Sequence, residues 1–290
     1  MLLLQGKEVS QKIRALLQVR TEAIKSKLGR PPRLDVILVG ADQASQVYVK
    51  NKHIACVKIG MESMVHQLSK DISEAELLKL IRSLNDNTQV DGILVQMPLP
   101  QQISSEKVLE TISPTKDADG LTPLSTGLLW AGQPGVRSCT PQGVIHILEH
   151  YKIPIAGKHA VVVGRSQIVG KPMAALLLEK NATVSICHSK TQNLEEITRQ
   201  GDIIVVAAGK ARFLGRSAFK QNAVVIDVGI HGVGSGGIAG ASGANICGDV
   251  RSEELTDWVS ALTPVPGGVG PMTITCLLEN TIWLTERRLK

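Results

Sequence analysis

The chain has 290 residues, of which 43% are hydrophobic, and its 32 basic and 26 acidic residues give a net charge of +6. This length can hold one large domain or two ordinary ones. The 2% aromatic content is too low for the base-stacking platforms of nucleic-acid-binding proteins. The apolar runs are far shorter than the ~18 residues that span a bilayer, and the apolar start MLLL is too short for a secretory signal. We therefore expect a cytoplasmic protein that binds neither nucleic acid nor membrane.

The first half of the chain alternates between helix-like and strand-like segments, as in α/β proteins with a mainly parallel sheet. The predicted helices are 7–28, 44–59, 74–84 and 104–112, and the predicted strands are 33–40, 62–68 and 91–98. Residues 113–142 are rich in Pro, Gly, Ser and Thr, which predicts a linker or a passage that lines a cleft.

The positive charge is concentrated in the first predicted helix and its flanks, because residues 1–33 hold eight basic and two acidic residues. The rest of the chain is therefore neutral. A solvated amphipathic helix explains this segment, and attraction for a polyanionic substrate explains it as well.

The second half continues the alternation. The predicted helices are 141–151, 172–180, 193–199 and 272–286, and the predicted strands are 159–163, 182–187, 202–209 and 223–230. The last two strands are nearly continuous apolar runs, as expected of strands covered on both faces. The Gly- and Ser-rich residues 231–245 predict a flexible surface loop, and residues 263–273 predict a stiff Pro/Gly loop.

The cysteines are five in number and show neither a CxxC pair nor clustered His/Cys spacing. An odd count without such spacing predicts reduced, mostly buried thiols rather than a disulfide framework or a zinc site. We therefore expect no metal. The cysteines are Cys56, Cys139, Cys187, Cys247 and Cys276.

A glycine turn follows the predicted strand 159–163. The strand stops at Gly164, and Gly170 and Pro172 precede a helix-forming stretch. Backbone N–H groups and the positive end of a helix dipole can hold a pyrophosphate there. Ser166 stands where the dinucleotide fingerprint has its second glycine, and the third glycine comes one residue late. The pattern alone therefore fits a dinucleotide site and an ordinary strand–turn–helix equally well.

The next predicted strand lacks the acid that an NAD site places near its end to hold the ribose 2′-hydroxyl. His188, Ser189 and Lys190 stand there instead, and Arg165 lies in the glycine turn. Cations and hydroxyls suit a 2′-phosphate, which a carboxylate would repel. This pattern favours NADP over NAD, unless Arg165 and Lys190 are only solvated surface charges.

Tyr48 and Lys52 are four residues apart, which puts both on one face of the predicted helix 44–59. Lys52 is either a surface charge beside a half-buried ring or a lysine at the wall of a cleft. Desolvation in a cleft would lower its pKa and let it exchange protons near neutrality. Gln96 follows a strand and Asp119 lies in the predicted linker, where α/β proteins place ligand contacts. Each of these two residues alone also fits ordinary turn chemistry.

Several of these segments occur together in one order. They are YVKNK (48–52), DGILVQMPLP (91–100), KDADG (116–120), VVVGRSQIVGKP (161–172), CHSKT (187–191), VIDVGI (225–230), GDV (248–250) and TPVPGGVGPMT (263–273). Over nearly its whole length the chain thus resembles the bifunctional methylenetetrahydrofolate dehydrogenase/cyclohydrolase family. Such enzymes oxidise 5,10-methylenetetrahydrofolate to the 5,10-methenyl form with NADP and hydrolyse that product to 10-formyltetrahydrofolate.

The resemblance implies a two-domain α/β fold with an active-site cleft between the domains. A folate-binding catalytic domain would span 1–120 and be completed by the C-terminal helix 271–290. A Rossmann-like NADP-binding domain would span 140–270. The implied substrate is a folate, in free or polyglutamylated form, and the implied assembly is a homodimer.

The resemblance also assigns the site residues. Lys52 matches the catalytic lysine, Tyr48 would stack on the folate, Gln96 would hydrogen-bond Lys52, and Asp119 would accept hydrogen bonds from the pterin. The matches to cofactor-binding positions are Gly164, Arg165, Ser166, Ser189 and Ile230, with Arg165 and Ser189 at the 2′-phosphate. The matches to the loop that edges the folate site are Pro266, Gly267 and Gly268.

Two other functions compete with this one. The first is an NADP-dependent dehydrogenase without cyclohydrolase activity, and the retention of Lys52 and Gln96 argues against it. The second is a non-catalytic NADP-binding module, which would leave Tyr48, Lys52 and Asp119 unexplained.

Overall fold

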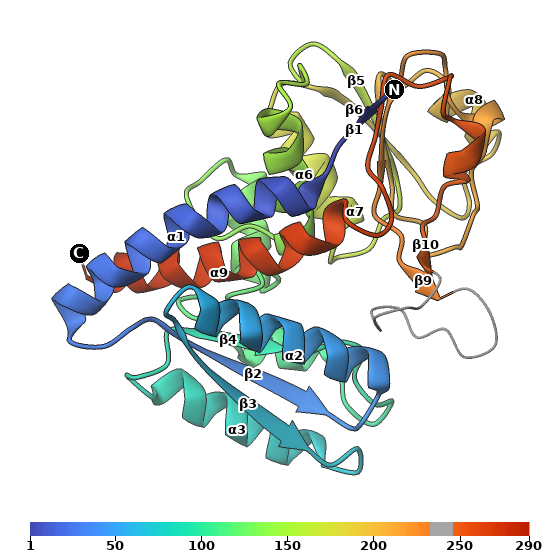
Figure 1. The fold of residues 1–290 in the computed structure, drawn as a ribbon. Helices are drawn as coiled ribbons and strands as arrows, with labels where there is room; N and C mark the ends of the chain where they lie inside the picture. Colours follow the sequence, from blue (N-terminus) through green and yellow to red (C-terminus); the bar gives the residue numbers. More distant parts are fainter. Residues whose placement is uncertain (233–245, 290) are drawn as a thin grey trace. The chain divides into compact units, whose positions relative to one another are not determined.

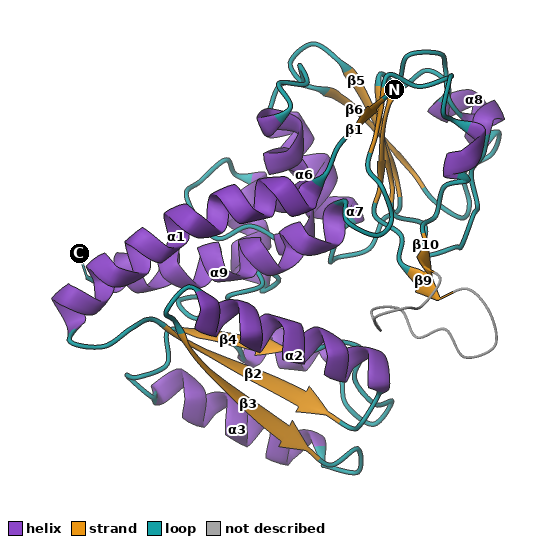
Figure 2. Cartoon of the chain, viewed as in Figure 1, coloured by secondary structure: helices purple, strands orange, loops and turns teal. Residues whose placement is uncertain are grey.

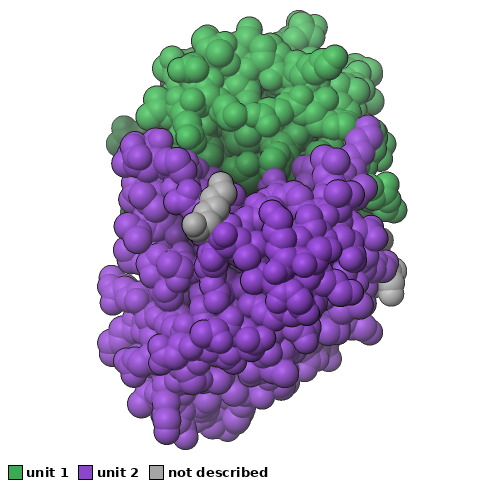
Figure 3. Space-filling model, turned by 90° about the vertical axis from the view of Figure 1, so that its left-hand side faces the viewer, with its two compact units in different colours: residues 1–11, 140–273 green, residues 12–139, 274–290 purple. Residues whose placement is uncertain are grey.

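The computed structural model describes residues 1–232 and 246–289 (Figure 1). The chain divides into two compact units, coloured separately in Figure 3. Unit 1 comprises Met1–Gln11 and Thr140–Thr273, and unit 2 comprises Lys12–Cys139 and Ile274–Lys290. The chain passes between the units at three places, within the helices α1 (Gly6–Leu28), α6 (Cys139–His150) and α9 (Val269–Arg288).

Unit 2 contains a three-stranded parallel sheet in the order β3 (Glu62–Leu68), β2 (Arg33–Val39), β4 (Gly92–Val95). The central strand β2 is buried on both faces because its side chains alternate between two hydrophobic clusters. Leu34, Val36 and Leu38 pack in the cluster that includes α2 (Gln43–Lys58). Ile37 and Val39 pack in the cluster that includes α3 (Glu74–Asp86) and α4 (Ser105–Thr111). Figures 1 and 2 show α2 and α3 on opposite faces of this sheet.

The prediction of a linker over 113–142 is wrong in its middle and at its end. Helix α5 (Pro123–Trp130) forms within this segment, and α6 (Cys139–His150) begins inside it. Thr122 caps α5, because its side chain accepts a hydrogen bond from the Ser125 N–H, and Pro123 occupies the first turn where no N–H is needed. The Ser- and Thr-rich composition therefore marks a helix start here.

Unit 1 contains a six-stranded parallel sheet in the order β1-β11-β8-β7-β5-β6. Its strands are β1 (Leu2–Leu3), β5 (His159–Val163), β6 (Thr183–Cys187), β7 (Ile203–Val206), β8 (Val224–Asp227) and β11 (Ala261–Leu262). The chain proceeds from β5 to one side for β6 and then to the other for β7. This change of direction at β5 is the topological switch point at which α/β sheets bind ligands.

Helices α7 (Gly170–Glu179) and α8 (Leu194–Thr198) follow β5 and β6. Short 3-10 helices occupy Arg216–Ala218 and Ser252–Glu254. Strands β9 (His231–Gly232) and β10 (Ile246–Cys247) form a separate antiparallel pair. The predicted surface loop 231–245 otherwise lies outside the described residues.

The observed strands differ from the predicted ones in their ends and in number. The strand predicted at 91–98 ends at Val95, and those at 202–209 and 223–230 shrink to β7 and β8, because their last residues turn into loops. The two-residue strands β1 and β11 were not predicted. The prediction of mostly buried, unpaired cysteines is confirmed, since all five are free and four are buried, with Cys247 partly exposed. Among the described residues no helix combines the length and hydropathy needed to cross a membrane.

Candidate active site and nucleotide pocket

Lys52 lies on α2 with its side chain buried, at 8% exposure. Its ammonium Nζ donates a hydrogen bond of 2.9 Å to Gln96 Oε1. The Gln96 Nε2 donates in turn to the Met97 carbonyl at 2.6 Å, which fixes the amide with its oxygen toward Lys52. Gln96 is held at the end of β4 because its backbone N–H donates to the Ile37 carbonyl of β2. The structure thus brings together two residues that are 44 positions apart in the sequence.

The electrostatic setting of Lys52 favours proton exchange. Burial lowers the pKa of Lys52, and the negative charge of Asp119 partly opposes this by favouring the ammonium form. Burial likewise raises the pKa of the Asp119 carboxyl, and the Lys52 charge opposes that shift. The Cys139 thiol donates a hydrogen bond to the carbonyl of Ala118, the residue before Asp119, at 3.6 Å. Tyr48 lies one turn before Lys52 on α2, and burial raises the pKa of its hydroxyl.

Asp119 is placed by a tight turn that begins within the motif KDADG (116–120). The buried carboxylate of Asp117 accepts hydrogen bonds from the N–H groups of Gly120, Leu121 and Thr122 at 2.8–3.2 Å. Gly120 has a φ of +69°, and a Cβ there would lie 2.5 Å from the carbonyl carbon of Arg137. Only glycine fits this position. An aspartate three residues before a glycine was the available sequence signal for this turn.

The glycine turn after β5 is constrained by close backbone approach. Gly164 has a φ of +146°, and a Cβ there would lie 2.4 Å from the Ala207 carbonyl oxygen. A Cβ at Gly170 would lie 2.3 Å from the Gly164 carbonyl oxygen. Ser166, which replaces the second fingerprint glycine, accepts hydrogen bonds on its Oγ from the N–H groups of Val169 and Gly170. The serine hydroxyl therefore satisfies two N–H groups at the start of α7 that an anion was predicted to face.

A cavity of about 450 Å³ lies at the carboxyl ends of β5, β6 and β7. This volume falls within the about 300–1,000 Å³ of ordinary small-molecule sites. Gly164, Arg165, Ser166 and Ser189 line it together, so four of the five predicted cofactor residues meet in one place. The sequence suggested Lys190 as a cation for the 2′-phosphate. Lys190 does not line the cavity, whereas Lys210 does.

Two buried aspartates organise the loop after β7. Asp249 accepts hydrogen bonds from the N–H groups of Ala208, Gly209 and Lys210, and its carboxylate also contacts His231 Nε2 at 2.6 Å. Asp227 accepts from the N–H groups of Gly229, Asp249 and Val250, and burial raises its pKa to about 6. These carboxylates fix the backbone of one cavity wall, a role that the motifs VIDVGI and GDV did not reveal.

The remaining predicted residues lie elsewhere in unit 1. Ile230, the fifth predicted cofactor residue, is not among those that line the cavity, and its side chain faces Gly270. Pro266 is exposed, Gly267 has a φ of +103°, and Gly268 is buried with no room for a Cβ beside the Pro264 carbonyl. The prediction of a cleft between two domains stays a prediction.

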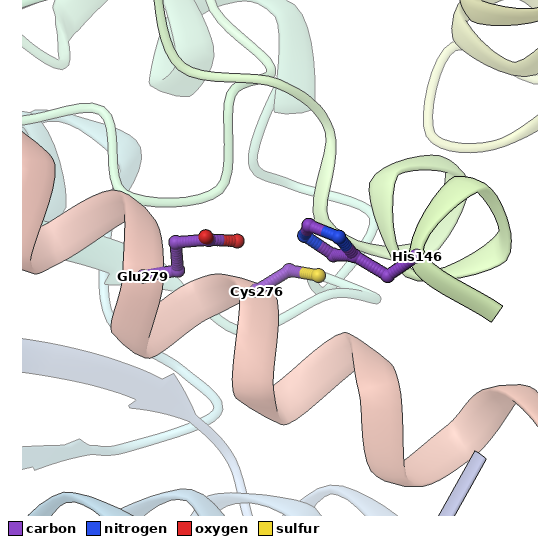
Figure 4. A group of neighbouring side chains, drawn as sticks. All are labelled: His146, Cys276 and Glu279. Carbon is purple, nitrogen blue, oxygen red and sulfur yellow. The ribbon is translucent and has the colours of Figure 1, made fainter. Parts of the chain in front are cut away.

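Figure 4 shows a group of potential metal ligands, His146 on α6 and Cys276 and Glu279 on α9. Burial raises the pKa of the Cys276 thiol well above its ordinary value, and the charge of Glu279, one turn along the same helix, raises it further. Cys276 and Glu279 belong to unit 2 and His146 belongs to unit 1, so the group supports no metal assignment.

Known proteins resemble the chain throughout. Residues 4–119 match the family described as tetrahydrofolate dehydrogenase/cyclohydrolase, catalytic domain, and residues 138–289 match its NAD(P)-binding domain. A protein of Bdellovibrio bacteriovorus named bifunctional protein FolD is 57% identical over 100% of this chain and 98% of its own length. The crystal structure of a bifunctional FolD methylenetetrahydrofolate dehydrogenase/cyclohydrolase from Campylobacter jejuni is 47% identical, with a TM-score of 0.94 over 99% of both chains. A Trypanosoma brucei FolD structure in complex with NADP and an inhibitor is 33% identical, with a TM-score of 0.94 over 100% of this chain and 99% of that one.

Proposed function

Since the chain belongs to the tetrahydrofolate dehydrogenase/cyclohydrolase family, we propose that it oxidises 5,10-methylenetetrahydrofolate with NADP and hydrolyses the resulting 5,10-methenyl form to 10-formyltetrahydrofolate. The observation that carries the proposal is the buried Lys52, hydrogen-bonded to Gln96 and facing the charge of Asp119. A surface lysine would not need such partners. This arrangement suits a group that moves protons during a reaction.

The hydrolytic step needs proton transfer. Water attacks the carbon of the methenyl amidinium, and protons then move from the incoming oxygen to the leaving nitrogen. We assign this transfer to Lys52, because burial lowers its pKa and so favours exchange between the ammonium and amine forms. Gln96 holds the lysine in place through its amide oxygen.

Substrate placement falls to the residues around Lys52. The Asp119 carboxylate would accept hydrogen bonds from the amino and ring N–H groups of the pterin, a donor edge that it matches well. Tyr48, one turn from Lys52, would stack against the folate. Pro266, Gly267 and Gly268 are proposed to edge the folate site, in keeping with the family motif that they match.

The cavity after β5 fits NADP. Bound there, the cofactor supplies the hydride acceptor, and the protein contributes positioning. Gly164 and Ser166 belong to the turn at the switch point, while Arg165 and Ser189 would contact the 2′-phosphate. Ile230 is proposed to contact the cofactor outside this cavity. Hydride loss itself needs no protein base, because the folate nitrogens stabilise the cation that forms.

We further propose that residues 1–120, completed by 271–290, bind the folate, and that residues 140–270 bind NADP. A cytoplasmic location and a homodimeric state complete the proposal. The absence of paired cysteines suits a reducing compartment. Sedimentation of the purified protein tests the dimer, and a monomer at assay concentration would exclude it.

One absorbance assay separates the candidate functions. Protein is mixed with methylenetetrahydrofolate and NADP, and the NADPH and methenyl signals are followed together. NADPH formation with methenyl decay faster than uncatalysed hydrolysis supports both activities. Accumulation of both signals would mean a dehydrogenase alone, and no signal would favour a non-catalytic NADP-binding module.

A further inference from the structure

Lys210 has the placement of an anion-binding residue. It follows β7 and lines the cavity of about 450 Å³ that also contains Arg165 and Ser189. Its backbone N–H is fixed by the Asp249 carboxylate at 3.1 Å, and its Nζ lies 5.0 Å from the centre of the Phe213 ring. Within the described parts of the chain, neither Lys210 nor Arg165 has a carboxylate within salt-bridge distance. Two cations without counter-charges thus face one cavity.

The position of Lys210 identifies which end of a nucleotide it would meet. Phe213, over which its ammonium is held, lines the cavity together with Leu194, and these apolar side chains suit the faces of an adenine ring. Ser189 follows β6, where dinucleotide sites contact the ribose 2′ position. Lys210 therefore lies at the adenosine end.

A single cation does not balance the anion expected there. A phosphate monoester carries a charge of about −1.5 to −2 at neutral pH, more than the charge of one guanidinium. Lys190 is also near Ser189 in the sequence, but it is exposed and does not line the cavity. The cavity supplies its second positive charge from the opposite side of β5, through Lys210.

We propose that Lys210 is a second cation for the adenosine 2′-phosphate and that it sets the preference for NADP over NAD together with Arg165. The inference rests on the proposed NADP-dependent function. Phe213 keeps the ammonium at the cavity through a cation–π contact. The lysine is a specificity-determining residue because NAD has no group that needs it.

The test uses fragments that isolate the adenosine end. The affinities of 2′,5′-ADP and 5′-AMP are measured by calorimetry for the wild type and for Lys210→Gln, Lys210→Arg and Lys190→Gln. Lys210→Gln should weaken 2′,5′-ADP about tenfold and 5′-AMP less than about twofold, since one charge-assisted contact to the 2′-phosphate is lost. Lys210→Arg should restore most of the affinity. Lys190→Gln removes a neighbouring charge of the same sign and should change both affinities less than about twofold.

The outcomes separate the two levels of the proposal. A wild type that binds 2′,5′-ADP no better than 5′-AMP would remove the NADP assignment itself, and Lys210's role with it. A wild type with a clear preference that Lys210→Gln leaves intact would overturn the Lys210 proposal alone. Equal weakening of both fragments would also overturn it, because Lys210 would then serve the part that they share. Unchanged thermal unfolding of each variant confirms that folding is not the cause.

Discussion

The candidate sites of the two units hold their cationic side chains in opposite ways. In unit 2, Lys52 is buried and its ammonium is hydrogen-bonded to Gln96 within the protein. Asp119 faces the charge of Lys52, and the pKa values of both groups are shifted by burial. In unit 1, Arg165 and Lys210 are exposed at the cavity and lack carboxylate partners among the residues described.

This difference follows from the two tasks. Burial lowers the pKa of Lys52, which favours proton transfer, and the charge of Asp119 partly opposes that shift. A binding site for an anionic cofactor needs cations that stay charged and whose counter-charge is the phosphate of the ligand. Changes in unit 2 should therefore affect the chemical step of hydrolysis. Changes at the cavity of unit 1 should affect nucleotide affinity and leave hydrolysis intact.

Lys52→Met should have the largest effect and should separate hydrolysis from oxidation most clearly. This variant removes the proton-transfer group and keeps the aliphatic stem, so hydrolysis of methenyltetrahydrofolate should fall by about 10²–10⁴-fold. Oxidation should fall less, because hydride transfer needs no protein base. The decay of methenyl absorbance without NADP measures the first rate, and NADPH formation measures the second.

Lys50→Met is the matched control for this variant. Lys50 lies on the same helix, two residues earlier, and is exposed. The Lys50→Met variant should keep both activities within about twofold of the wild type, in line with ordinary surface substitutions. Wild-type hydrolysis by Lys52→Met would show that Lys52 is not the proton-transfer group and that burial there serves only structure.

Gly164→Ala should have the opposite effect, because it should weaken NADP binding and leave hydrolysis unchanged. A Cβ at Gly164 would lie 2.4 Å from the Ala207 carbonyl oxygen in a backbone conformation with a φ of +146°. Such strain costs about 1–3 kcal/mol, and the displaced turn should raise KM for NADP by about 10- to 100-fold. Hydrolysis of added methenyltetrahydrofolate without NADP should stay near the wild-type rate.

Gly157→Ala is its control, because Gly157 has a φ of +73° but no atom within 4 Å of the place that a Cβ would occupy. It carries the positive-φ strain without the backbone collision. If both variants raised KM for NADP equally, backbone strain anywhere in unit 1 would be the cause. Loss of hydrolysis in Gly164→Ala would mean that the two units do not separate the activities.

Arg165→Ala should have a smaller and more selective effect. The loss of one contact to the 2′-phosphate should raise KM for NADP about tenfold and leave KM for NAD nearly unchanged. Steady-state rates with each cofactor give the comparison, with Lys190→Ala as the control for a nearby exposed cation. An equal increase of KM for NADP and for NAD would show that Arg165 does not contact the 2′-phosphate and contacts a part that both nucleotides share.

The sequence predicted those parts of the fold in which local pattern and tertiary structure agree. The nearly continuous apolar runs that include 203–206 and 224–227 became buried parallel strands, and the predicted helix 74–84 became α3, which a Ser73–Glu76 capping box begins. The missing acid after β6 pointed to Ser189, which lines the cavity. These signals work because each depends on a few neighbouring residues.

The rest depended on contacts between distant segments. Strand β1 has two residues and pairs with β11 about 260 positions later, so no periodicity marks either one. Asp249 supports the loop at Ala208–Lys210 through backbone N–H groups, which leave no pattern of side chains to read. The sequence pointed to Lys190 as a cation because it adjoins Ser189 along the chain. Lys210 lines the cavity because β7 lies beside β5 in the sheet.

The smallest expected effect is a shift in pH dependence from Asp119→Asn. The Asp119 charge raises the pKa of Lys52 against the lowering by burial, so its removal should lower that pKa further. The limb of the hydrolysis profile that reports Lys52 should then move to lower pH by about one pH unit, the lower end of the effect of a nearby opposite charge. The measurement is kcat for methenyltetrahydrofolate at saturation across pH, corrected for uncatalysed hydrolysis. Saturation separates this shift from weaker pterin binding, which changes KM. An unmoved limb would mean that Asp119 is already protonated or acts only on the pterin, and a shift to higher pH would contradict the electrostatic coupling itself.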